Sequence, residues 1–373
     1  MLRNLRISGF RGLREFAMSG LGRVNLLVGT NNCGKTSVLE SIHMLSVPGS
    51  PLPLWQAQLR RGELIDATTE RQIDVAHLFY GRTLALGTGF TIKGNGTTGQ
   101  QDLAASLVVH ERQKLPPGMQ REMFADDEEN SDDILAAPGL FRSTGLGLAW
   151  TIGSSIKNLG LPITRRGGVR DRIIFASPDV SGAETPSEVS FITTEGLTRD
   201  STISMFERVV LTPDEATLLR ALRTIEPDIE RIASVGTYAR QSSRDVRGGL
   251  AMMVAGQRIP IGSMGDGIWR LLGIALALVQ ARGGVLLVDE IDTGLHDSVL
   301  VDMWRLVFET ARSLDVQVFA TTHSRDCYEA LAAVTEPDRA EISLQRIERE
   351  KVEAVAFTEL EIRQAADRGL EVR

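Results

Sequence analysis

The residues with the clearest chemistry form a glycine-flanked loop near the N-terminus. The run Gly29-Thr30-Asn31-Asn32-Cys33-Gly34-Lys35-Thr36 fits the pattern G-x-x-x-x-G-K-[ST] in full, and Ser37 follows it. Glycines let main-chain N–H groups close around phosphates, the lysine ammonium reaches the outer phosphates, and the threonine hydroxyl ligates Mg²⁺. The spacing therefore predicts a phosphate-binding loop with a metal ligand at Thr36.

Two adjacent carboxylates follow an apolar run far along the chain. The run Val285–Val288 ends at Asp289 and Glu290. We expect Asp289 to hold Mg²⁺ through water, in the manner of a Walker B motif. Glu290 is placed to polarise an attacking water molecule.

Two further groups lie at fixed spacings from these carboxylates. The segment Ser263-Met264-Gly265-Asp266-Gly267 precedes Asp289, and a serine and glycine at a helix start predict a second anion site. His323 ends the next apolar strand after Asp289, where its ring can hydrogen-bond a γ-phosphate. A packed core histidine is the alternative.

The elements that must position these groups fall into two blocks. In the first block, short apolar runs and glycine turns predict strands over 5–8, 16–19 and 24–28. An apolar face that ends before Pro48 predicts a helix over 35–46. The second block begins with a predicted helix at 268–279, whose apolar run is interrupted only by Arg270. A strand at 285–288, an amphipathic helix at 300–311 and another strand at 316–321 follow it. Such alternation indicates an α/β fold with a mainly parallel sheet.

The middle of the chain carries weaker signals. Short strand-like stretches lie at 89–92 and 173–176, and a helical pattern begins near Thr212. The acidic run between Asp126 and Asp133 is typical of a solvated loop. A small arginine cluster is either surface charge or a nucleic-acid contact, at Arg165, Arg166, Arg170 and Arg172. The last residues predict a hairpin over 342–349 and 352–357 and a final helix.

Composition narrows the class of protein. The 373 residues carry a net charge of -7, with 41 basic residues against 48 acidic ones, which argues against wholesale nucleic-acid binding. Only Cys33 and Cys327 are cysteines, so neither a disulfide framework nor a cysteine-rich zinc site is expected. With no long apolar run and no secretory signal, we expect a cytoplasmic protein without a membrane partner.

The order of these motifs resembles that of ABC-type ATPases, and more closely the SMC, RecF and OLD (overcoming lysogenization defect) group. The opening Leu5-Arg6-Ile7-Ser8-Gly9-Phe10-Arg11-Gly12 is also similar to theirs, as is the run from Asp289 to His296 where the family has its D-loop. The resemblance implies an α/β P-loop NTPase fold: an ABC-type head with a β-rich N-terminal lobe, built from 1–48 and 251–373, and an insertion over 49–250. Stand-alone OLD-like AAA family ATPases without a Toprim domain are the most similar.

The resemblance implies ATP and Mg²⁺ as cofactors and Glu290 as the catalytic base. It implies an ATP-dependent dimer or higher homo-oligomer, in which Ser263 and Gly265 complete the opposite subunit's site, and it places Arg11 near the nucleotide. The family's Q-loop glutamine has no clear counterpart, with His77 as one candidate and a core histidine as the other reading.

OLD proteins also carry a C-terminal Toprim nuclease. The residues after Val334 contain no Asp-x-Asp pair, so any nuclease is expected on another chain. The resulting hypothesis is an ATP-driven switch that regulates a separate effector, such as a Toprim nuclease, in bacterial anti-phage defence. The alternative is a RecF-like DNA-repair clamp, for which the arginine cluster would supply DNA contacts. A transporter subunit and an ATP-binding scaffold with little turnover are further readings, and no Asn-Lys-x-Asp motif of a GTPase occurs.

Overall fold

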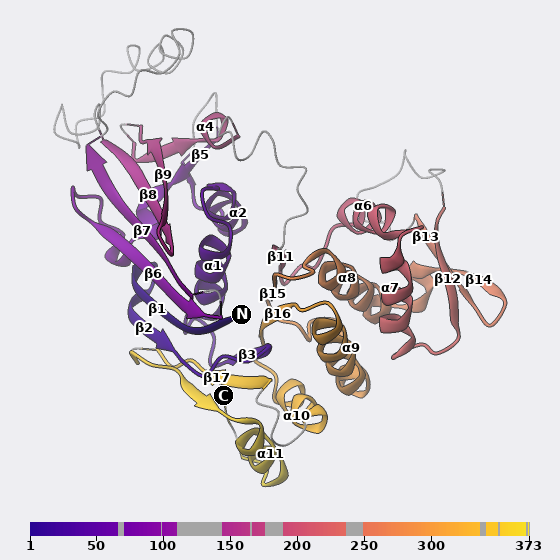
Figure 1. Cartoon of the computed structure of the whole chain (residues 1–373). Coiled ribbons are helices and arrows are strands. Elements are labelled where there is room, and N and C mark those ends of the chain that lie inside the picture. The colour runs from indigo at the N-terminus through magenta and orange to yellow at the C-terminus, as the bar shows by residue number, and fades with distance from the viewer. Residues whose placement is uncertain are drawn as a thin grey trace.

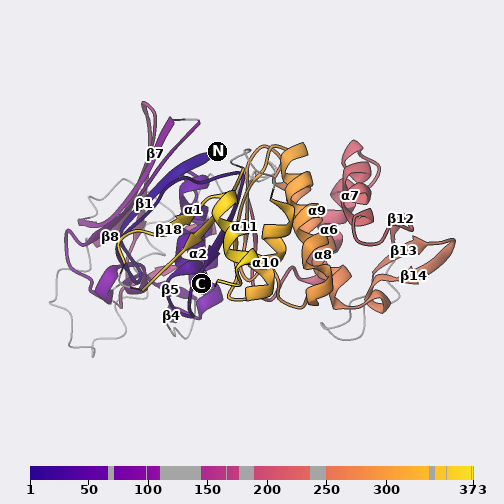
Figure 2. The ribbon, with the colours of Figure 1, turned by 90° about the horizontal axis from the view of Figure 1, so that it is seen from below.

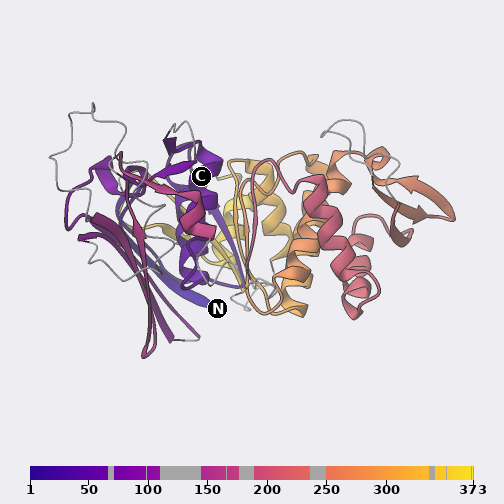
Figure 3. The ribbon, with the colours of Figure 1, turned by 90° about the horizontal axis from the view of Figure 1, so that it is seen from above.

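The computed structural model describes residues 1–65, 71–97, 99–109, 144–164, 166–175, 189–235, 249–335, 341–349, 351–370 and 372. These residues form a central parallel sheet with an antiparallel sheet on one side and a helical layer on the other (Figure 1). A helix-and-hairpin lobe extends beyond the helical layer (Figures 2 and 3). Within the described residues, no helix is both long enough and apolar enough to cross a membrane.

The central sheet brings together strands from both ends of the chain. Its order is β11-β15-β16-β3-β17-β18, and all neighbours are parallel except β18, which is antiparallel to β17. Every residue of β3 and β16 is buried, as expected for parallel strands covered on both faces. The strands are β3 (Val24–Val28), β11 (Val189–Ile192), β15 (Val285–Val288), β16 (Gln317–Thr321), β17 (Ile342–Arg346) and β18 (Val355–Phe357).

The antiparallel sheet lies on the side of the N-terminal helix. Its order is β2-β1-β6-β7-β8-β9, with β1 (Leu2–Phe10), β2 (Leu13–Met18), β6 (Gly89–Gly96), β7 (Gly99–Val109), β8 (Thr144–Ile152) and β9 (Ser155–Pro162). Helix α1 (Lys35–Ser46) lies between the two sheets and contacts both (Figure 3). The Trp150 indole of β8 donates a hydrogen bond to Met44 O, 3.0 Å away, near the end of α1. The position of α1 is therefore fixed from both sides.

A second helix and several short elements pack beside α1. Helix α2 (Leu52–Arg61) packs on α1, and a small sheet has the order β10-β5-β4. The members of this region are β4 (Leu64–Ile65), β5 (Gln72–Asp74), β10 (Gly168–Arg170), α4 (Asp171–Phe175) and the 3-10 turns η1 (Val75–Leu78) and η2 (Tyr80–Arg82).

Helices cover the other face of the central sheet. The helices are α8 (Asp266–Gln280), α9 (Leu300–Ser313) and α10 (Arg325–Val334), followed at the C-terminus by α11 (Glu359–Asp367), with turns η4 (Ile261–Met264) and η5 (Asp297–Val299). The projecting lobe packs on α8 and α9 and comprises α6 (Arg199–Val209), α7 (Pro213–Arg223), β12 (Ile229–Ser234), β13 (Leu250–Val254) and β14 (Gln257–Pro260).

The structure confirms most elements expected from the sequence and corrects one of them. The helix expected at 35–46 and the strands at 24–28 and 285–288 have the expected bounds. The strand expected at 173–176 is wrong: Asp171–Phe175 is helix α4, whose Phe175 ring lies 5.8 Å from the Trp55 ring of α2. This edge contact favours the helix over the β-branched signal of the adjacent isoleucines Ile173 and Ile174.

The range 49–250 supplies strands to both main sheets. Strands β6 to β9 continue the sheet of β1 and β2, and β11 pairs with β15 at the edge of the central sheet. The division of the chain into a head and an insertion at residues 48 and 251 remains a prediction. The acidic run 126–133 and Arg165 lie outside the described residues.

Candidate nucleotide site

The phosphate-binding loop connects the buried strand β3 to helix α1. Gly29 has φ 147° and Gly34 has φ 107°, values that favour glycine. A Cβ at Gly29 would lie 2.3 Å from Ile347 O, so a side chain there would displace main chain. The loop can therefore close tightly before the first turn of α1, where free N–H groups favour an anion.

Lys35 is held over this loop by the loop's own carbonyls. Its Nζ donates hydrogen bonds to Gly29 O at 2.7 Å and to Thr30 O at 3.0 Å. The lysine is buried, so its ammonium is held close to the loop, ready to meet phosphate oxygens.

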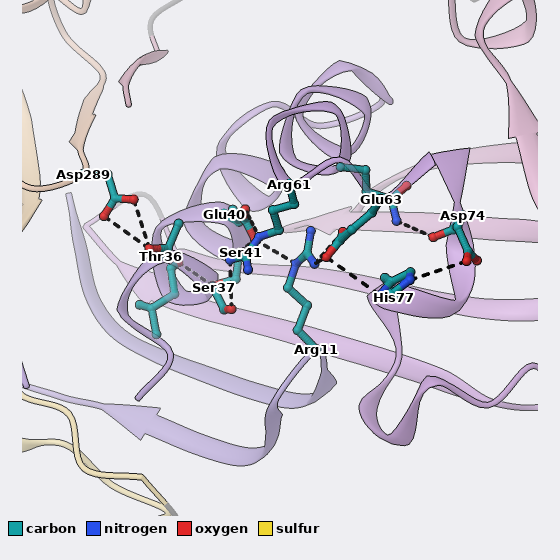
Figure 4. Close-up of polar contacts among 12 residues, drawn as sticks. Arg11, Thr36, Ser37, Glu40, Ser41, Arg61, Glu63, Asp74, His77 and Asp289 are labelled. Carbon is teal, nitrogen blue, oxygen red and sulfur yellow. Dashed lines mark hydrogen bonds and ion pairs between the residues drawn. The ribbon is translucent and has the colours of Figure 1, made fainter. Parts of the chain in front are cut away.

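Thr36 and Asp289 meet across 253 residues of sequence. The Thr36 hydroxyl donates to Asp289 Oδ2 at 3.0 Å, with Oδ1 at 3.3 Å (Figure 4). Asp289 Oδ1 also accepts a hydrogen bond of 2.6 Å from the Thr321 hydroxyl at the end of β16. The three residues meet because β3, β15 and β16 are parallel neighbours and end at the same edge of the sheet.

This donor set fits Mg²⁺. A hydroxyl and a carboxylate are hard oxygen ligands, and Mg²⁺ in nucleotide sites uses one or two protein ligands plus phosphate and water. Thr36 and Asp289, the two residues that the sequence predicts as ligands, would hold the ion.

Glu290 and His323 lie together beside Asp289. The His323 Nδ1 atom is 3.5 Å from Glu290 Oε1, and Thr293 Oγ1 donates to Glu290 Oε2 at 3.3 Å. Both side chains are partly exposed. The main chain of Glu290 has φ 48°, in the left-handed region, and its N–H donates to Thr321 Oγ1 at 2.8 Å. A partly exposed carboxylate next to an imidazole can bind and orient a water molecule.

Ser263 and Gly265 lie at the entry to helix α8. Ser263 belongs to η4, and Gly265, with φ 88°, is the residue before α8. Both are exposed to solvent. They are thus accessible to a second molecule, and their contact with nucleotide stays a prediction.

Arg11 lies in a buried cluster of alternating charges. Its Nε is 2.8 Å from Glu40 of α1, and its Nη1 donates to both carboxylate oxygens of Glu63 at 2.7 and 2.8 Å (Figure 4). Glu40 also accepts from Arg61 at 2.9 Å, and Arg61 in turn reaches the Ser37 hydroxyl at 3.4 Å. In this structure Arg11 is paired with carboxylates, so its contact with nucleotide stays a prediction.

His77 lies on the far side of this cluster from the loop. Its ring nitrogens are 3.9 Å from Glu63 and 3.5 Å from Asp74, and Figure 4 shows the ring beyond Arg11 as seen from Thr36. Its side chain thus contacts the acidic partners of the cluster. A role as a Q-loop residue remains untested.

Comparisons with known proteins agree with this geometry. Residues 168–326 match the model of the family described as "AAA domain, putative AbiEii toxin, Type IV TA system". The RecF protein of Clostridioides difficile is 47% identical over 45 residues, 12% of each chain. Part of this chain is therefore similar to AAA-domain proteins, and a shorter stretch is similar to RecF.

Two similarities extend over most of the chain. An "ATP/GTP phosphatase" of Helicobacter pylori is 22% identical over 369 residues, covering 90% of this chain and 88% of the relative. The solved SMC head domain of Thermotoga maritima covers 96% of this chain and 98% of its own, at 12% identity and a TM-score of 0.47.

Arg270 is a further residue of this candidate site, and in the sequence it stands out only as an interruption of an apolar helix. It is buried in α8, and its guanidinium donates to Thr193 O at 3.1 Å, Asp289 O at 3.2 Å and Glu290 O at 3.0 Å. Burial lowers the Arg270 pKa from its ordinary value, against the opposing effect of Asp292, Asp289 and Glu290. A single arginine in an otherwise apolar helix was the available signal.

The acidic partners of Arg11 had no comparable signal. Glu40 lies on the face of α1 that a periodicity argument treats as surface, and Glu63 follows a short helix 52 residues after Arg11. Only the packing of α1, α2 and β1 brings them together.

Proposed function

We propose that this chain binds and hydrolyses ATP and acts as a switch that dimerises on ATP. The observation that carries the proposal is the meeting of Thr36 with Asp289, with Glu290 and His323 directly beside them. A phosphate loop, a metal-ligand pair and a carboxylate for water at one sheet edge form the set that phosphoryl transfer to water requires.

The chain's own residues divide the work of hydrolysis. The loop N–H groups and Lys35 bind the β- and γ-phosphates, and Thr36 and Asp289 would hold Mg²⁺, which would neutralise charge on the phosphates. Glu290 accepts a hydrogen bond from water and orients it toward the γ-phosphorus. His323 donates to a γ-phosphate oxygen, where negative charge develops.

Dimerisation completes each site in this proposal. Ser263 and Gly265 are exposed at the start of α8, a helix of 15 residues whose N-terminal N–H groups favour an anion. A second copy would present these residues to the γ-phosphate bound in the first copy. Hydrolysis removes that phosphate and lets the two copies separate.

The proposal extends to an effector protein on a separate chain. We propose that the closed dimer regulates a separate chain and take a Toprim-type nuclease of anti-phage defence as the candidate. The description of the matched family, a putative toxin of a toxin–antitoxin system, supports a setting in which two chains act together. Nuclease activity of the mixed chains that does not depend on ATP would count against this assignment.

Phosphate release by purified protein tests the enzymatic proposal. We expect ATP hydrolysis by the wild type and a loss of roughly 100-fold or more in Glu290→Gln. Glu309→Gln is the matched control, because Glu309 is an exposed glutamate on α9 away from the site. Equal rates for Glu290→Gln and Glu309→Gln would overturn the assignment of Glu290.

A further inference from the structure

The Arg270 side chain of α8 binds two other segments of main chain beside the site. Its Nη1 donates to Thr193 O after β11, and its Nη2 donates to Asp289 O and Glu290 O after β15. The side chain is largely buried, so water does not replace these bonds easily. A planar guanidinium can serve several acceptors at once, which a lysine ammonium does less well.

Two of the carbonyls that Arg270 binds, Asp289 O and Glu290 O, belong to a strained turn. Glu290 has φ 48°, a conformation that side-chain-bearing residues rarely adopt. Its N–H is held by Thr321 and its C=O by Arg270, so both ends of the residue are fixed. This turn sets the direction of the Glu290 side chain toward His323.

The same arginine belongs to the helix that begins beside Ser263 and Gly265. Arg270 lies one turn into α8, whose first residue is Asp266. A displacement of this helix start would therefore move the group that holds Asp289 and Glu290 of the same chain.

We propose that Arg270 is a positioning residue for hydrolysis: it holds the Glu290 turn in its productive conformation and anchors that turn to helix α8. This inference rests on the proposed function, in which Glu290 orients water. Arg270 itself touches neither nucleotide nor water, and its effect on the reaction passes through Glu290.

Two variants of Arg270 and a matched control test the inference. Arg270→Lys keeps the positive charge, and Arg270→Gln keeps a hydrogen-bond donor but removes the charge. The controls are Arg223→Lys and Arg223→Gln, because Arg223 of α7 also donates to main-chain carbonyls, Ile229 O at 2.7 Å and Glu230 O at 3.3 Å, outside the site. For each protein we would measure kcat, the Kd of a fluorescent ATP analogue, and the melting temperature.

The inference predicts a split between turnover and binding. Both Arg270 variants should lose about 100-fold in kcat, as expected for a misplaced catalytic group. Their Kd should stay near that of the Arg223 controls, while their melting temperatures fall because three buried carbonyls lose a donor. The double variant Arg270→Gln, Glu290→Gln should hydrolyse ATP no more slowly than Glu290→Gln alone, because both changes remove the same function.

Two results would overturn the inference. In the first, both Arg270 variants have the same kcat as the Arg223 controls. The other is a parallel loss of kcat, nucleotide binding and melting temperature, which a purely structural arginine would give. A wild type without ATPase activity, or a fully active Glu290→Gln, is a different outcome that refutes the proposed function itself.

Discussion

The Thr36 hydroxyl donates a 3.0 Å hydrogen bond to Asp289 Oδ2, joining the end of the phosphate loop to the end of a strand 253 residues later. The same carboxylate accepts from Thr321, so its orientation is fixed before any ligand binds. A hydroxyl and a carboxylate fixed in this way would offer Mg²⁺ two preorganised oxygen ligands.

Asp289→Asn should remove the response of nucleotide binding to Mg²⁺. The amide keeps the shape of the side chain but loses the charge that favours a cation. In titrations with a fluorescent ATP analogue, the wild type should bind at least about 10-fold more tightly with Mg²⁺ than with EDTA, and the variant should show little difference. A variant that gains as much affinity from Mg²⁺ as the wild type would contradict the metal assignment.

Lys35→Met should weaken ATP binding by about 10- to 100-fold, the value of one or two charge-assisted hydrogen bonds. The reason is that Nζ, now bonded to Gly29 O and Thr30 O, is the loop's only side-chain cation. Lys157→Met is the control, since Lys157 Nζ makes an exposed 3.4 Å contact with Pro48 O. Equal affinities in the two variants would count against a phosphate role for Lys35.

Glu40→Gln should lower the free energy of unfolding by about 3 kcal/mol, because it leaves two arginines facing a neutral amide. Glu40 is 1% exposed between Arg11 and Arg61. The matched change Glu329→Gln breaks an exposed pair with Arg325 and should cost at most about 0.5 kcal/mol. Urea denaturation measures both, and similar losses in the two variants would argue against a structural role for the cluster.

His43 should make the fold sensitive to mild acid. Burial, and to a smaller extent the nearby Arg60, lower the pKa of His43 from 6.5 to about 3. The unfolded chain therefore binds a proton that the folded chain does not, and stability falls as pH drops from about 6.5 toward 3. The slope from this residue is about 1.4 kcal/mol per pH unit.

His43→Leu should flatten that dependence. Urea midpoints between pH 7 and 4.5 would be compared for the wild type, His43→Leu and His296→Leu, where His296 is an exposed control. The wild type and the control should lose stability in parallel, and His43→Leu should lose less. A slope unchanged in His43→Leu would show that other groups cause the acid sensitivity.

Where the signals are local, the sequence predicts the elements that bring the candidate site residues together. The loop, helix α1, strand β15 and His323 follow from short motifs, and the parallel order of β3, β15 and β16 brings their ends together. Thr36, Asp289, Glu290 and His323 were all expected at one site on these grounds.

Short sequence motifs do not predict which strands and side chains pair when they lie far apart in the sequence. That β6 pairs with β1 depends on a register between residues 83 to 94 positions apart, which the pattern of β6 alone does not carry. The partners of Arg11 and the carbonyls bound by Arg270 are likewise set by tertiary packing. The short run at 173–176 failed for another reason: a few apolar residues have no period that separates helix from strand.

Mass measured by light scattering, with and without Mg·ATP, shows whether ATP brings two copies of the chain together. The proteins compared would be the wild type, Glu290→Gln and the Glu309→Gln control. The account predicts that ATP raises the mass of Glu290→Gln to a stable dimer or higher assembly while phosphate release is lost, and that the wild type and control return to their starting mass as ATP is consumed. An unchanged mass in Glu290→Gln together with normal hydrolysis would contradict the account.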